Sequence, residues 1–360
     1  MSFPRIKPLG WAMFEVLTSA QMNQLDIDHA KATDGTYVKD YAAGLSFSTK
    51  LDAGVWTRNT ALIYIPPANQ WVGLDGNGAM LTAGGYVKVD HTSFGAGLVS
   101  CTSLAFNGTD ILVGVGAPMT FASQEKIRRT TISGSGMLTW TNQLTAAAAS
   151  LTQLVVGYFP AAGLFITGSL VGNIETSPDG ITWTARTKPD FLYRQQMAFS
   201  NTLAVMVNFS AGDQYLTSPD GINWTARTFP VASAVGWVGV AYSQLDGMFM
   251  AISREGYVVR SSDGINWVQV FPTFSKALYP LGASFGASQV VTSGLHVLGN
   301  LWVTMKSGST APGVMCSIDQ GSTWKLLMST VGTPQVIAAS PGQLGVVDAD
   351  GLKLSNRFSF

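Results

Sequence analysis

The chain has 360 residues, of which 46% are hydrophobic and only 12% are charged, and its formal net charge is zero. This composition excludes a disordered chain, which combines low hydrophobicity with high net charge. No basic run or stripe is present, so nucleic-acid binding through a phosphate-tracking patch is not expected.

Residues 1–35 are expected to form a docking segment with a short helix, outside the main domain. Thr18 followed by Gln21 is typical of a helix start, and residues 19–33 favour a helix that Gly35 ends. So short a helix is marginal in water and needs a partner surface, either the chain's own main domain or another protein. The residues expected to dock are Trp11, Phe14, Met22 and Leu25.

The sequence predicts folding in a cytoplasm, without a signal peptide or membrane insertion. The first residues lack an apolar core of signal-peptide length. Cys101 and Cys316 fall in different expected sheets, which favours free thiols over a disulfide. Residues 154–174 are apolar and long enough to cross a bilayer, but Pro160 and four glycines favour two buried strands instead.

Beyond residue 60, short apolar runs alternate with turn residues, and one signature, Ser-x-Asp-(x)-Gly-x-x-Trp, occurs four times. Its tryptophans are 41, 43 and 57 residues apart, and a strand-rich period near forty predicts a β-propeller. Asp and Ser bond back to the backbone, Gly supplies positive φ, and Trp starts the next strand. The residues assigned to these turns are Ser177, Asp179, Gly180, Trp183, Ser218, Asp220, Gly221, Trp224, Ser261, Asp263, Gly264, Trp267, Ser317, Asp319, Gly321 and Trp324.

Extending the period predicts an all-β, seven-bladed β-propeller with the short N-terminal helical appendage; six or eight blades are the alternatives. The expected blades are 60–94, 101–140, 152–183, 194–224, 238–267, 286–324, and a composite of 334–360 with 36–58. The propeller domain thus covers residues 36–360 and is closed by pairing of 36–58 with 334–360. Such closure removes open sheet edges.

The four turns resemble the Asp-box, or BNR, repeat of sialidase-like propellers. The resemblance implies that their Asp, Ser and Trp residues are structural and lie on the face opposite the ligand site. A sialidase also needs an arginine triad, a Tyr nucleophile with a Glu, and an Asp acid, and no such constellation is recognisable. Arg186 and Arg227 repeat at one blade position, which indicates a shared structural role.

Catalytic, cofactor and metal sites are not expected from the remaining polar residues. The chain has four glutamates, Glu15, Glu125, Glu175 and Glu255, and no spacing pairs one of them with an acid such as Asp213 or Asp246. The three histidines, His29, His91 and His296, are scattered and have no metal-ligand neighbours. The sequence therefore favours a protein that is not an enzyme.

The links between successive blades, opposite the recurring turns, are unusually aromatic. Exposed aromatic clusters suit sugar rings or protein partners, although such side chains often tuck under their own loops. The candidate recognition face comprises Phe191, Tyr193, Arg194, Phe229, Trp237, Phe274, Lys276 and Tyr279.

Residues 10–26 together with 32–35 resemble the N-terminal attachment segment of bacteriophage and prophage tail or fibre proteins. The resemblance implies a non-enzymatic virion protein of tail-fibre, receptor-binding or decoration type. It would join other virion proteins through residues 1–35 and bind a host surface glycan or protein, or a neighbouring virion protein; self-association stays open. The alternatives are a sialidase-like glycoside hydrolase and an intracellular assembly-factor propeller.

Overall fold

The fold is seen in a computed structural model of the whole chain. It describes residues 47–52, 61–66, 70–74, 100–116, 127–131, 141–142, 154–169, 174–187, 189, 194–208, 212–234, 236–270, 273–274, 290–307, 312–330, 336–340, 343–348 and 351–355. The expected N-terminal helix, with Trp11, Phe14, Met22 and Leu25, lies outside these residues.

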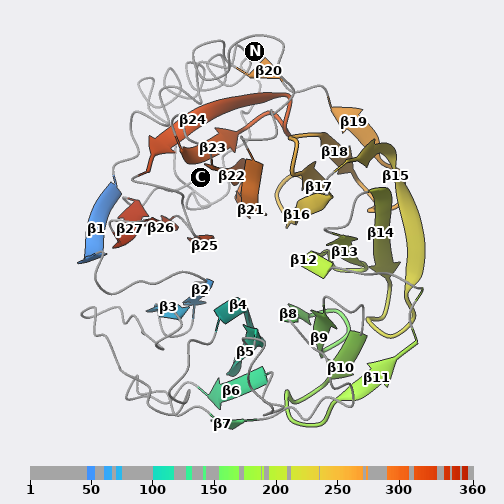
Figure 1. The fold of residues 1–360 in the computed structure, drawn as a ribbon. Helices are drawn as coiled ribbons and strands as arrows, with labels where there is room; N and C mark the ends of the chain where they lie inside the picture. Colours follow the sequence, from blue (N-terminus) through green and yellow to red (C-terminus); the bar gives the residue numbers. More distant parts are fainter. Residues whose placement is uncertain are drawn as a thin grey trace, which may run out of the picture.

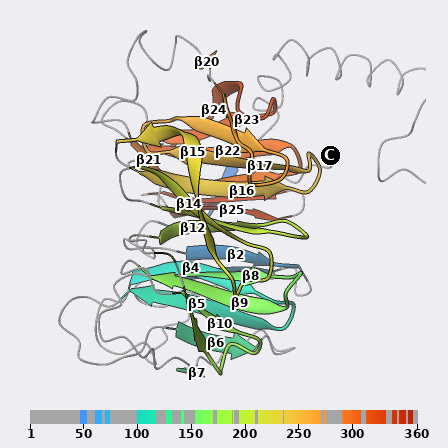
Figure 2. The same cartoon turned by 90° about the vertical axis from the view of Figure 1, so that its right-hand side faces the viewer.

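The described strands form sheets that radiate from a common axis, so the chain is an all-β propeller (Figure 1). Five sheets have four strands, one has five and one has two. Their inner strands contact one another in the ring order β2, β4, β8, β12, β16, β21 and β25, and β25 returns to β2. Seen from the side, the strands run roughly along the ring axis (Figure 2).

The strands follow each other from the axis outward in chain order, except in the last two sheets. The first sheets are β2 (Ala61–Ile65) and β3 (Gln70–Leu74); β4 (Ser100–Phe106), β5 (Asp110–Gly116), β6 (Ile127–Thr131) and β7 (Thr141–Asn142); and β8 (Leu154–Phe159), β9 (Leu164–Ser169), β10 (Ile174–Ser177) and β11 (Thr184–Arg186). The next are β12 (Arg194–Phe199), β13 (Ala204–Asn208), β14 (Gly212–Ser218) and β15 (Thr225–Ser233); and β16 (Trp237–Ser243), β17 (Met248–Ser253), β18 (Val258–Ser261) and β19 (Val268–Val270).

The last two sheets depart from the simple four-stranded pattern. One contains β21 (Val290–Leu298), β22 (Leu301–Ser307), β23 (Gly313–Ser317) and β24 (Thr323–Ser329), and β20 (Thr273–Phe274) adds a parallel fifth strand to β24. The other contains β25 (Val336–Ser340), β26 (Gln343–Asp348), β27 (Gly351–Ser355) and β1 (Phe47–Asp52).

The prediction of a propeller is confirmed, but complete four-stranded blades number five rather than seven. The described part of the expected first blade has only the two strands β2 and β3, and the sheet that ends at β24 has one strand too many. The sequence period could not reveal these differences, because it is measured from turn residues and tryptophans rather than from strands. A two-stranded sheet without such a turn and a short added strand both leave that period unchanged.

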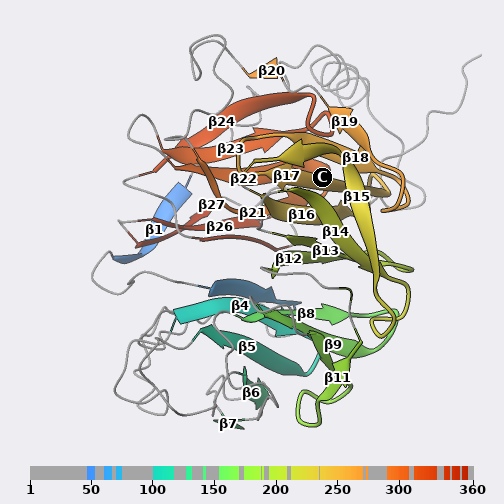
Figure 3. The same ribbon diagram turned by 45° about the vertical axis from the view of Figure 1, so that its right-hand side comes forward.

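The two ends of the described chain meet in the closing sheet. β1 pairs antiparallel with β27, from Phe47 opposite Ser355 to Asp52 opposite Gly351. Figures 1 and 3 both show β1, in blue, beside β27, in red. The outer strand of this sheet therefore comes from the beginning of the chain and the other three from its end.

The hydrophobic core is divided into layers between neighbouring sheets. One layer joins Val205 and Tyr215 of one sheet to Val240 and Phe249 of the next, and Trp267 closes it from the side. Equivalent clusters fill the spaces on either side. Because both faces of a middle sheet are covered, strands such as β13 are buried at every position, which explains their continuous apolar runs.

Near the axis, one side chain ties three sheets together. The Oε1 atom of Gln196 on β12 accepts hydrogen bonds from the backbone N–H of Val240 on β16 and of Leu295 on β21, at 3.1 and 3.0 Å. Its amide nitrogen donates to the Leu295 carbonyl at 3.1 Å. Backbone groups on the inner edge of a sheet have no further strand to pair with, so a side chain satisfies them here.

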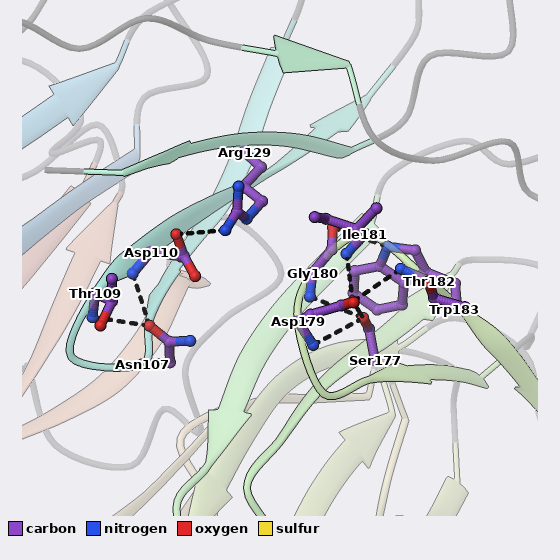
Figure 4. Close-up of polar contacts among 10 residues, drawn as sticks. All are labelled: Asn107, Thr109, Asp110, Arg129, Ser177, Asp179, Gly180, Ile181, Thr182 and Trp183. Carbon is purple, nitrogen blue, oxygen red and sulfur yellow. Dashed lines mark hydrogen bonds and ion pairs between the residues drawn. The ribbon is translucent and has the colours of Figure 1, made fainter.

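The four recurring turns, here called the Ser–Asp turns (177–183, 218–224, 261–267 and 317–324), share one hydrogen-bond pattern. In the first, the Asp179 carboxylate accepts from the N–H groups of Ile181 and Thr182, both at 2.8 Å, and from the Ser177 hydroxyl (Figure 4). The Ser177 Oγ accepts from the Gly180 N–H at 2.8 Å. Each turn thus satisfies its own backbone with its own side chains.

The Ser–Asp turns at 218–224, 261–267 and 317–324 also close against the preceding sheet. The indole N–H of Trp267 donates to the Gly264 carbonyl at 3.1 Å, which holds the ring against the turn. Gly264 has a φ of +71°, and a Cβ there would lie 2.6 Å from the Leu203 side chain of the sheet before it. Glycine is therefore required both by the backbone angle and by the close approach.

Replacing Trp324 by Ala should lower the free energy of unfolding by about 3–5 kcal/mol, because its ring is fully buried between two sheets. Trp183→Ala should cost clearly less, since Trp183 is only partly buried. Chemical denaturation of both variants checks this ranking. Equal losses would contradict the burial difference.

The stability of the propeller should fall in acid as the Ser–Asp turns are protonated. Burial raises the pKa of Asp220, but hydrogen bonds from Asn223, Ile222 and Ser218 outweigh it and bring the pKa to about 2. The pKa of Asp263 is held well below its usual range in the same way. An unfolded Asp titrates near pH ~3.9, so this stabilisation is present above that pH and disappears as pH falls toward about 2.

Denaturation midpoints measured from pH 7 to pH 2 check this expectation. The double variant Asp220→Asn/Asp263→Asn is the control: it should be less stable at pH 7 but lose less stability between about pH 4 and 2. An unchanged acid dependence in this variant would show that other groups cause it.

Candidate functional site

The ring has two ends with different turns. In an antiparallel sheet successive turns alternate between ends, so the Ser–Asp turns share one end with the links between first and second strands. The opposite end carries the links between second and third strands and the connections from one sheet to the next. We call these the Ser–Asp end and the connection end.

At the connection end, one carboxylate joins two loops. Glu255 lies in the turn between β17 and β18, and its Oε1 accepts the N–H of Ala234, in the connection after β15, at 2.7 Å. Its Oε2 accepts a short hydrogen bond from the Ser233 hydroxyl. The Arg254 N–H also donates to the Gly236 carbonyl, at 3.0 Å. Ser233, Ala234, Gly236 and residues 253–257 are called the Glu255 loop pair below.

The Glu255 loop pair is also braced within each loop. The Ser253 Oγ accepts the N–H of Tyr257 at 2.9 Å, and the Ser253 N–H donates to the Tyr257 carbonyl at 2.9 Å. In the other loop, the Gly236 N–H donates to the Ser233 Oγ at 2.7 Å. Two short loops are thereby held in fixed positions on rigid sheets.

The braced turn presents an aromatic ring to solvent. Tyr257 is 37% exposed, a rare state among the large apolar side chains of the described residues. A tyrosine on a rigid loop offers contact area and a polar tip at little entropic cost, which suits recognition of a protein or sugar. The arrangement supports binding through a preformed surface.

Two residues of the expected recognition face are buried instead. Phe229 and Trp237 are 3% and 0% exposed, and their ring centroids lie 4.1 Å apart. Phe229 belongs to β15 and Trp237 starts β16, so the pair fills the layer between two sheets. An aromatic side chain next to a loop can close the core below it, and that outcome overturns the prediction for these two residues.

The other expected recognition residues are less fully described. Arg194 begins β12 and Phe274 ends β20, which pairs with β24. Phe191, Tyr193, Lys276 and Tyr279 lie outside the described residues. Neither Glu255 nor Tyr257 was expected at this face, although the sequence Arg-Glu-Gly-Tyr between two strands contains one of the few glutamates of the chain.

The acids considered for a hydrolase do not converge in the described part of the chain. Glu255 holds the loop pair, whereas the Asp246 carboxylate, at the Ser–Asp end, accepts the indole N–H of Trp302 at 3.2 Å. Glu175 is buried within β10, and Asp213 lies in β14. Glu15 and Glu125 are not among the described residues. Arg186 and Arg227 donate to Thr176 and Thr217, at equivalent places on their strands.

His296 lies near the axis beside the Gln196 side chain. A Cβ on Gly294 would be 3.0 Å from the Nε2 atom of His296 and 3.1 Å from the Gln196 amide, so the two side chains meet over this glycine. Burial lowers the pKa of His296 to about 4, which leaves the ring neutral at pH 7. Across the described ranges, no cluster of His, Cys, Asp or Glu is suited to a metal ion.

Comparisons with known proteins identify the fold. No family model and no curated protein sequence matches the chain. Among solved structures, YCF48 bound to D1 peptide has 16% identity and a TM-score of 0.57, covering 88% of this chain and 97% of that one. A chain of the mitotic checkpoint complex has 11% identity and a TM-score of 0.59, covering 87% and 95%.

An enzyme shares the fold as well. The Niastella koreensis GH74 enzyme has 14% identity and a TM-score of 0.54, covering 82% of this chain and 43% of that one. At these identities the likeness concerns the propeller alone. No helix that could span a bilayer occurs in the described parts of the chain.

Replacing Glu255 by Ala should loosen the Glu255 loop pair without unfolding the propeller. The Ala234 N–H loses its carboxylate acceptor, so its hydrogen exchange should accelerate about tenfold, as expected for a hydrogen bond to a charged group. Amide exchange followed by mass spectrometry measures this. Glu255→Gln is the matched control, because its side chain keeps one carbonyl acceptor for the Ala234 N–H. Equal acceleration of exchange in both variants would show that the negative charge, rather than the acceptor atom, protects this N–H.

Proposed function

We propose that this chain is a non-enzymatic binding protein of a bacteriophage-type particle, whose connection end recognises a partner protein. The observation that carries the binding role is the Glu255 loop pair, in which exposed Tyr257 lies on a turn that is braced by a second loop. Because the loops are already ordered, little conformational entropy is lost on binding.

The fold is compatible with a protein ligand. YCF48, a propeller of similar extent, is known in a structure with a bound peptide, and another similar propeller belongs to the mitotic checkpoint complex. A peptide or loop of a host surface protein, or of a neighbouring virion protein, is therefore our preferred ligand. A surface glycan would also suit an exposed tyrosine and is the second possibility to be measured.

The contacts of the acids favour binding over hydrolysis. The Glu255 carboxylate accepts from both the Ser233 hydroxyl and the Ala234 N–H, so it is engaged in holding loops. Asp246 is engaged with Trp302 at the other end of the ring. A two-carboxylate mechanism needs acids within ~10 Å across a sugar. We therefore rank the glycoside hydrolase behind the binding protein.

The setting on a particle rests on the sequence of residues 10–26 and 32–35. Its resemblance to attachment segments of phage tail and fibre proteins suggests that residues 1–35 join other virion proteins. The propeller would then be displayed outward after folding in the host cytoplasm. The closing β1–β27 pair supports such a design, because the displayed domain stays tied to the chain that precedes it.

Tyr257→Ser should reduce adsorption of particles carrying this chain to host cells by about tenfold or more, as expected for an exposed aromatic anchor. The matched control is Leu245→Ser, which changes an exposed apolar residue at the Ser–Asp end. Protease or glycosidase treatment of the cells then separates a protein receptor from a glycan. Unchanged adsorption by Tyr257→Ser would remove the Glu255 loop pair from the proposal.

Deletion of residues 1–35 should leave a folded propeller that no longer sediments with particles. Circular dichroism and thermal unfolding report the fold, and sedimentation followed by immunoblotting reports incorporation. A folded truncated chain that joins particles at the full level would rule out the docking role of this segment.

A further inference from the structure

Three isoleucines repeat as exposed residues at the Ser–Asp end. Ile181, Ile222 and Ile265 occupy the same position in three Ser–Asp turns, directly after the glycine, and are 48%, 36% and 39% exposed. The three turns belong to sheets that neighbour one another in the ring, since β8 contacts β12 and β12 contacts β16. The isoleucines therefore follow one arc of the rim, here called the isoleucine arc.

The turns themselves do not need isoleucine. Each isoleucine contributes backbone groups to the turn: its N–H donates to the Asp carboxylate at 2.8 Å, and the Ile265 carbonyl also accepts from the Tyr215 hydroxyl. The fourth turn has Ser322 after its glycine and keeps the same Ser–Asp hydrogen bonds. A single exposed apolar side chain is ordinary, but the same apolar residue repeated at one position of three neighbouring turns, where the turn does not require it, points to a use outside the turn.

The charges of the same turns select the kind of partner. Asp179, Asp220 and Asp263 stand two residues before the isoleucines, and these three turns contain no lysine or arginine. Two copies of this arc facing each other would bring aspartates against aspartates, which is unfavourable. Arg186 and Arg227 lie on the outer strands and are engaged by threonines. The fourth turn, which lacks the isoleucine, instead has the Arg260 guanidinium at its Gln320.

We propose that the isoleucine arc is a second docking surface, which binds a basic amphipathic segment of another protein. Its apolar side chains would cover the three isoleucines, and its lysines or arginines would lie beside the aspartates. The surface is at the opposite end of the ring from the Glu255 loop pair, so the propeller could hold two partners at once.

The test uses the full chain and a synthetic amphipathic helix of leucine and lysine, with binding followed by fluorescence anisotropy. The triple variant Ile181→Ser/Ile222→Ser/Ile265→Ser, which copies the serine found at position 322 of the fourth turn, should bind it at least about tenfold more weakly. Added salt should weaken binding to the wild type. A leucine–glutamate helix, and a leucine–lysine peptide scrambled to have no apolar face, should bind poorly.

Tyr257→Ser is the control for the other surface and should bind the peptide like the wild type. Thermal unfolding should show that the triple variant remains folded, since its turn hydrogen bonds are retained. Equal binding by the wild type and a folded triple variant would overturn the proposal, as would equal binding of the lysine and glutamate helices. Self-association of the wild type that the triple variant abolishes would overturn it in favour of a second copy.

Discussion

The close contact of the Ser–Asp turns at 218–224, 261–267 and 317–324 with the preceding sheet is the constraint on which this propeller depends. A glycine with positive φ lets the turn approach side chains of that sheet, and the tryptophan three residues later covers the layer between them. The turn can be this compact because its own Ser and Asp satisfy its backbone. Neighbouring sheets are thus joined by a local motif rather than by long connections, which suits a repeat protein.

The two ends of the ring are under different constraints on their sequence. At the Ser–Asp end, backbone geometry constrains the Ser, Asp, Gly and Trp positions, whereas the residue after the glycine varies, as Ile265 and Ser322 show. At the connection end, no such repeated turn joins the two loops; instead, the Glu255 carboxylate and the Arg254 N–H link them. Loops freed from a repeat can differ from sheet to sheet, and for that reason this end is where specific recognition would be expected.

The sequence was sufficient to predict the propeller, because its turns need particular residues at fixed spacing. It was not sufficient for the strands that follow other rules, namely the two-stranded sheet of β2 and β3 and the parallel strand β20. Phe229 and Trp237 show why the site was harder: an aromatic beside a loop can face solvent or the core, and only packing decides. Glu255 could not be recognised, because its partners lie about twenty residues earlier in another sheet.

The closing sheet gives the fold a mechanical property. Tension that enters through the chain before Phe47 reaches the propeller through the ladder between β1 and β27. That ladder also closes the circle of sheets, so anchoring and ring integrity share the same backbone hydrogen bonds. A force strong enough to detach β1 would expose the unpaired edge of β27. The pairing of β1 with β27 is therefore the point at which the domain would open first under tension.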